Sequence, residues 1–163
     1  MLSILPKGFF VLSISFILFG FVPAFADSCP AAKEFEAQII SCGNNSVAVD
    51  HAKECMKSVQ AEGEALVNEL HQAASSRDRQ KLNTAIQQSV GRITLMQDQT
   101  DKVAKYADVM IDDPRSKSLK TSLECFVTNF KKIQKLINVM DDEIIRAMQA
   151  RDVAVGVFKK LGK

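Results

Sequence analysis

Proline and glycine are scarce in the part of the chain that follows residue 26. Apart from isolated positions such as Pro30, Gly43, Gly91 and Pro114, long stretches are written in Ala, Leu, Glu, Gln, Lys and Met. These residues favour helix, and the alternation of β-branched and polar residues that marks strands is missing. The sequence therefore predicts an all-α protein.

The chain also lacks a strong excess of charge of either sign. It carries 21 Lys and Arg residues against 19 Asp and Glu residues. This balance argues against a nucleic-acid-binding protein, because such proteins concentrate basic residues on one face. Hydrophobic residues make up 47% of the chain, which is ample for a core and unlike a disordered segment. One folded domain is the natural expectation for this length.

Motifs that carry catalysis or bind cofactors are missing as well. The sequence contains no Gly-rich phosphate loop, no G-x-S-x-G elbow, no H-E-x-x-H pair and no C-x-x-C-H haem attachment site. We therefore expect a protein that is not an enzyme and that carries no metal or other cofactor.

Isolated polar residues do not change this expectation. His51 and His71 lie 20 residues apart on one predicted helix, on nearly opposite faces, and are expected to be exposed or half-exposed. Asp112-Asp113 is expected to cap a helix, and Asp141-Asp142-Glu143 to lie on an outer, solvated surface. Core filler, not haem ligation, is the expected role of most of the methionines Met56, Met96, Met110, Met140 and Met148.

The N-terminal residues have the pattern of a secretory signal peptide. A single positive charge at Lys7 precedes an apolar run from Phe9 to Val22, and the small-residue site Ala24-Phe25-Ala26 follows. The apolar run has about 14 residues, fewer than the roughly 20 that span a bilayer. This difference favours a cleaved signal over a membrane anchor.

Cleavage after Ala26 leaves a mature chain that begins at Asp27. An acidic residue two places before Cys29 does not fit a lipidation site, so the mature protein is expected to be soluble. The expected organisation is a signal peptide at 1–26 and a helical bundle domain at 27–163, exported to the periplasm or the exterior.

All four cysteines, Cys29, Cys42, Cys55 and Cys125, lie after residue 26. An even number of cysteines in an exported chain predicts two disulfides, because the destination is oxidising. No pair has the C-x-x-C spacing of redox and zinc sites. Structural cross-links are therefore the expected role.

Apolar spacing predicts one short helix and three long ones. The short helix runs from about Pro30 to Cys42 and buries Phe35 and Ile39. The second runs from about Val49 to a turn at 75–78, and the third from about Arg79 to Asp112, ahead of Pro114. The expected core positions of the long helices are, in order, Val49, Ala52, Met56, Val59, Gly63, Leu66, Leu70 and Ala73; Leu82, Ile86, Val90, Ile93, Met96, Val103, Tyr106 and Met110; and Leu119, Leu123, Phe126, Phe130, Ile133, Ile137, Met140, Ile144, Ala147, Arg151, Ala154 and Phe158.

Three long antiparallel helices and one short helix form an elongated bundle, and this geometry favours one disulfide connectivity. At about 1.5 Å per residue, Cys42 and Cys125 lie near the same end of the bundle, while Cys29 and Cys55 lie deeper. Since the Cα atoms of a disulfide approach to about 6 Å, we expect the pairs Cys42–Cys125 and Cys29–Cys55.

Two positions on the predicted apolar faces carry residues that are unusual in a helical core. Gly63 can admit a close helix or a ligand, and Arg151 can mark the point where the last helix leaves the bundle. Beyond Arg151 the chain has apolar residues on several faces and then lysines, a pattern that suits a helix C-terminus and also contact with a membrane surface or a partner.

These features favour a non-catalytic exported protein that acts through protein–protein interaction, as an adhesion, assembly or chaperone-like component. A homo-oligomer is compatible with the long apolar seams. The alternative is a carrier that holds an apolar ligand or haem inside the bundle.

Overall fold

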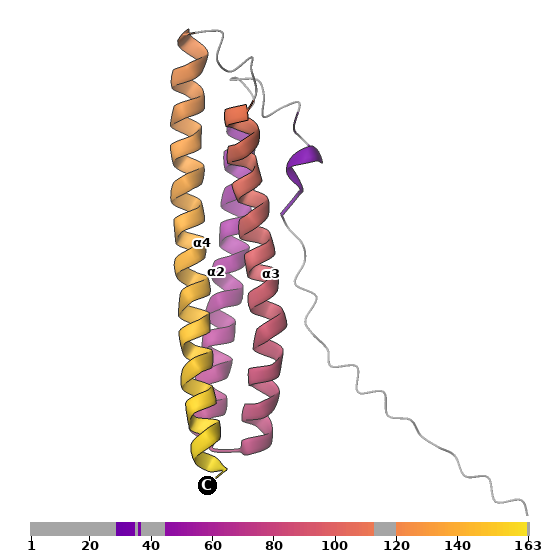
Figure 1. Cartoon of the computed structure of the whole chain (residues 1–163), viewed down its shortest axis with the longest axis vertical. Helices are drawn as coiled ribbons and strands as arrows, with labels where there is room; N and C mark the ends of the chain where they lie inside the picture. The colour runs from indigo at the N-terminus through magenta and orange to yellow at the C-terminus, as the bar shows by residue number, and fades with distance from the viewer. Residues whose placement is uncertain (1–28, 35, 37–44, 113–119, 163) are drawn as a thin grey trace, which may run out of the picture.

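The structure, a computed structural model, describes residues 29–34, 36, 45–112 and 120–162. Three long helices dominate it: α2 (Asn45–Ser76), α3 (Arg79–Asp112) and α4 (Lys120–Leu161). They lie side by side in an elongated bundle in which α3 runs antiparallel to both α2 and α4 (Figure 1). The prediction of an all-α antiparallel bundle is confirmed.

The turn between α2 and α3 is built from three residues. Arg77 has a φ of 53°, the left-handed conformation that often ends a helix. Ser76 donates its hydroxyl to the carbonyl of Ala73 and accepts from the backbone N–H of Asp78. Asp78 then caps α3, because its carboxylate accepts from the backbone N–H groups of Gln80 and Lys81.

The core forms where the predicted apolar faces of the three long helices meet. On α2, six of the eight predicted seam positions are buried and the other two, Met56 and Ala73, are half-buried. The prediction fails at one position of α3, because Val90 is 49% exposed while its neighbour Ser89 is fully buried. Ser89 tolerates burial because its hydroxyl donates to the carbonyl of Ile86.

Helix α4 stays in the bundle to its end. Arg151 does not mark an exit, since Ala154 beyond it is buried and Phe158 packs against the core. Near the C-terminus the Arg79 guanidinium of α3 lies 5.0 Å from the centre of the Phe158 ring, a cation–π contact that ties the two helix ends together. Within the described ranges, no helix is long and apolar enough to cross a membrane.

Several predictions fall outside the described residues. These are the signal peptide at 1–26, the buried residues Phe35 and Ile39, the boundary at Pro114 and the seam position Leu119. Of the predicted short helix, the structure describes one 3-10 turn, η1 (Ala32–Glu34). The side chain of Leu123, at the start of α4, is also outside the description.

Candidate functional site

A disulfide fixes the N-terminal segment, residues 29–34, to the bundle. Cys29 is bonded to Cys55 of α2, with Cα atoms 5.1 Å apart, as the heights along the helices predict. Both cysteines are buried, which suits a structural cross-link. The second predicted pair cannot be followed, because Cys42 and the side chain of Cys125 are outside the described residues.

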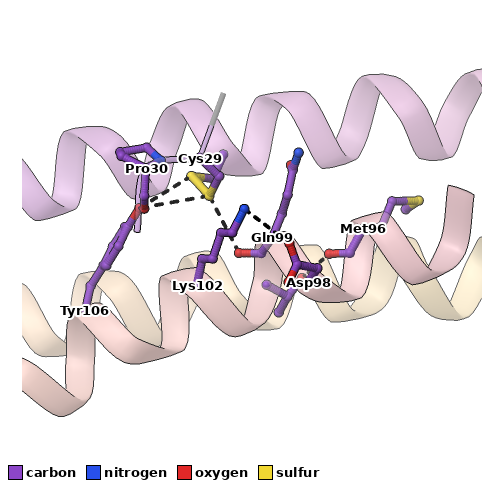
Figure 2. Close-up of a disulfide and its surroundings, with 9 residues drawn as sticks. Cys29, Pro30, Met96, Asp98, Gln99, Lys102 and Tyr106 are labelled. Carbon is purple, nitrogen blue, oxygen red and sulfur yellow. Dashed lines mark hydrogen bonds and ion pairs between the residues drawn. A yellow bond between two sulfur atoms is a disulfide. The ribbon is translucent and has the colours of Figure 1, made fainter. Parts of the chain in front are cut away.

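The segment also packs against α3 (Figure 2). The Tyr106 hydroxyl donates to the carbonyl of Pro30 and lies 4.0 Å from the sulfur atoms of both Cys29 and Cys55. The Cys29 sulfur lies 3.6 Å from the carbonyl oxygen of Gln99. The N-terminal segment is therefore held by both α2 and α3.

An ion-pair cluster centred on the buried Arg92 joins α2 to α3 near the middle of the bundle. Arg92 is 6% exposed and donates to the carboxylates of Glu62 and Glu69. Burial opposes the charged guanidinium, but the hydrogen bond and charge of Glu62, together with Glu69, outweigh it and raise the pKa of Arg92. None of these three residues was singled out from the sequence, although Glu62 and Glu69, seven residues apart, share one face of a helix.

On α4, Glu143 corrects the prediction that the acidic run lies on an outer surface. Asp141 and Asp142 are exposed, but Glu143 is only 5% exposed and faces Gly63 of α2. A Cβ atom at position 63 would overlap the Glu143 side chain. The glycine therefore admits a close helix, which is one of the two roles that the sequence predicts for it.

The Glu143 carboxylate is only partly satisfied. One oxygen accepts from the Arg146 guanidinium at 2.8 Å, while the other is buried and accepts no hydrogen bond within the described part of the chain. The side-chain oxygen of Gln99, under the N-terminal segment, is also buried and accepts no hydrogen bond from the described residues. The description contains no group of three His, Cys, Asp or Glu side chains placed to hold a metal ion.

The remaining predicted residues are widely separated. His51 is half-buried and His71 is exposed, on the same helix. Met96, Met110 and Met140 are buried in the core, and Met56 packs against it. Met148 differs, because it is 43% exposed on α4.

Two hollows on the described surface are open to solvent. One of about 730 Å³ lies between α2 and α3 beside their turn, lined by Glu69, Gln72, Lys81 and other mainly polar residues. A smaller one of about 260 Å³ lies between α2 and α4, lined by Val67, His71, Arg146 and their neighbours. Neither of these two is enclosed like the cavity of a small-molecule carrier.

Exposed apolar side chains are distributed unevenly over the bundle. Among the described residues, every exposed large apolar side chain lies on α3 or α4, and none lies on α2. They are Val90, Leu95, Ile111, Val127, Val139, Ile145, Met148 and Val153. Single exposed apolar residues are normal on a protein surface, whereas their gathering on one side can mark an interaction surface, so the feature that matters here is their restriction to two neighbouring helices.

Comparison of the chain with protein-family models, with curated proteins and with solved structures finds no match.

Proposed function

We propose that this chain is an exported, non-catalytic protein that acts by binding other proteins through the surfaces of its helices. The observation that carries the proposal is the concentration of exposed large apolar side chains on α3 and α4. A helix of a monomeric protein normally turns such residues inward, and Ile145 and Val153 are 49% and 57% exposed.

Export is supported by two features. The first 26 residues have the charge, apolar run and small-residue site of a secretory signal. The disulfide between Cys29 and Cys55 is of a kind found mainly in oxidising compartments. The periplasm or the exterior of the cell is therefore the proposed location.

The test is the intact mass and absorption spectrum of the protein purified from its native compartment. We expect the mass of Asp27–Lys163 less four hydrogens, for two disulfides, and no absorption in the visible range. Light scattering after size exclusion then gives the number of copies in the particle. A retained lipid, chromophore or metal would contradict the interaction proposal and favour the alternative, a carrier of an apolar ligand or haem.

A further inference from the structure

The contacts between α3 and α4 fix which of their residues lie at the same height. Arg79 lies on Phe158 and next to Gly162, so the start of α3 is level with the end of α4. About 30 Å along the bundle from this end, Asp101 of α3 acts electrostatically on Asp141 of α4. Both carboxylates are exposed, so they mark the solvent side of the line where the two helices meet.

Five of the exposed apolar residues gather around this line. At 3.6 residues per turn, Val127, Ile145 and Met148 lie within about 40° of the Asp141 direction on α4. On α3, Val90 and Ile111 lie within about 20° and 80° of the Asp101 direction. We call this surface the α3/α4 face; its members are Val90, Asp101, Ile111, Val127, Asp141, Ile145 and Met148.

The α3/α4 face has an apolar group toward each end and acidic residues between them. Val90 and Met148 lie about 15 Å from the Arg79 end, and Ile111 and Val127 about 48 Å from it. Asp101 and Asp141 lie between these levels. The exposed fractions of the apolar side chains range from 42% to 49%, so each has area left to bury.

Among the described residues, neither Asp101 nor Asp141 forms an ion pair within 4.0 Å. Of the cations close by in sequence, Lys102 pairs with Asp98 and Arg146 with Glu143, and the exposed Lys105 lies one turn beyond Asp101. Burial, then Asp142 and Asp101, raise the pKa of Asp141. A cation supplied from outside would relieve this repulsion.

We propose that the α3/α4 face binds a basic amphipathic helix of another protein, which completes a four-helix bundle. The distance between the two apolar groups, about 33 Å, requires a helix of about 22 to 25 residues. That helix carries apolar residues near both ends and Lys or Arg midway, opposite Asp101 and Asp141. The inference rests on the proposed function and names the face and the chemistry of the partner.

Site-specific photo-crosslinking in the native cells tests the face. A benzoylphenylalanine residue replaces Val90 or Ile145 on the face, or Glu64 or Asn68 on the exposed side of α2 as a control. We expect both face positions to cross-link to the same protein and both control positions to give no product. The cross-linked peptide should show helical apolar spacing with Lys or Arg midway.

The other outcomes overturn the inference. Cross-links from the face to a second copy of this chain would make it a homo-oligomer interface, and cross-links to lipid would make it a membrane-binding surface. Equal yields of cross-linked product from the control positions would show that binding is not specific to the α3/α4 face. No product from either face position would show that this face binds no partner. Cross-links to a protein from α2 alone would contradict the face while the proposed function stands.

Charge exchange tests the acidic centre with a synthetic peptide of the cross-linked segment. We expect Asp101→Lys with Asp141→Lys to weaken peptide binding at least tenfold, and the matched pair Asp50→Lys with Glu64→Lys on α2 to change it less than twofold. Replacing the midway Lys or Arg of the peptide by Glu should restore binding to the first variant only. Circular dichroism confirms that each variant folds, and equal affinity of the two variants would overturn the role of the carboxylates.

Discussion

At the scale of single residues, the backbone of Gly63 on α2 lies directly against the Glu143 side chain of α4. We predict that Gly63→Ala destabilises the protein by up to about 2 kcal/mol. The added methyl group overlaps the Glu143 side chain at a cost of about 1–3 kcal/mol, and the gain of about 1 kcal/mol that alanine brings to a helix offsets part of this cost. Urea unfolding followed by circular dichroism measures the change.

Gly91 provides the matched control. It lies in the middle of α3, is exposed, and has no atom within 4 Å of a Cβ placed there. Gly91→Ala should therefore stabilise the protein by about 0.5–1 kcal/mol. If Gly63→Ala stabilises it equally, the packing of Glu143 against α2 is wrong.

Asp141 gives a prediction about pH. Burial, Asp142 and Asp101 raise its folded-state pKa above the ordinary value of 3.8, so the folded state holds the proton more tightly than the unfolded state. Its contribution to stability is therefore present below pH 3.8 and is lost as the pH rises through the folded pKa. Asp141→Asn should stabilise the protein at pH 7, by no more than about 0.5 kcal/mol for so exposed a residue, and have no effect at pH 3.

Asp50 should show the opposite sign. The hydrogen bond from Lys53 lowers the pKa of Asp50, so its contribution to stability is present above pH 3.8 and is lost as the pH falls through the folded pKa. Asp50→Asn should therefore lower the thermal midpoint slightly at pH 7. Thermal unfolding of both variants between pH 3 and pH 7 measures the difference, and shifts of the same sign in both would contradict the assignment.

At the scale of the elements, the N-terminal segment depends on its covalent link to α2. The Cys29–Cys55 bond closes a loop with a sequence separation of 26. A loop of this size predicts a loss of about 3–4 kcal/mol when Cys29→Ser removes the cross-link. Amide hydrogen exchange should rise at residues 31–34 in this variant, while the middle of α4 stays protected.

Tyr106→Phe separates the hydrogen bond of the segment from its disulfide. This variant keeps the cross-link and loses the hydroxyl that donates to Pro30, so a smaller loss of about 1 kcal/mol is expected. A loss as large as that of Cys29→Ser would assign the fixing of the segment to Tyr106 instead of the disulfide.

The pairing of α2 with α3 depends on the ion pairs of Arg92. Arg92→Ala leaves the carboxylate of Glu62, 12% exposed, without its cation. We predict a loss of about 3 kcal/mol, since an uncompensated buried charge is costly. Lys53→Ala, which breaks an exposed pair with Asp50, should cost less than about 1 kcal/mol under the same denaturant titration. Equal losses would show that burial does not strengthen the Arg92 cluster.

Apolar periodicity was enough to predict the long helices and most of their buried faces. It failed where a polar residue takes a core position. Ser89 is buried in place of Val90 because it can bond its own helix, and Glu143 is buried because Gly63 lies opposite. The pairing of Glu143 with Gly63 joins residues far apart in the chain, so the sequence neighbourhood of neither residue reveals it. The surface between α3 and α4 is hidden in the sequence for the same reason.

At the scale of the whole molecule, the bundle is long and narrow (Figure 1). Helix α4 has 42 residues and measures about 60 Å. A rod of that length has a radius of gyration of about 18 Å, whereas a compact domain of the length expected after signal cleavage has about 14 Å. We predict a value of at least about 18 Å by small-angle X-ray scattering of the monomer. A value near 14 Å would contradict the extended bundle.

The odd number of long helices in the described bundle leaves their dipoles unbalanced. Helices α2 and α4 point in one direction and α3 in the other (Figure 1), so the field of one helix dipole remains uncancelled. Its positive end lies where α2 and α4 begin, and its negative end lies beside the turn at Arg77. A fourth helix on the α3/α4 face would cancel this field only if it ran in the direction of α3. The bundle therefore favours a docked helix that runs in the same direction as α3.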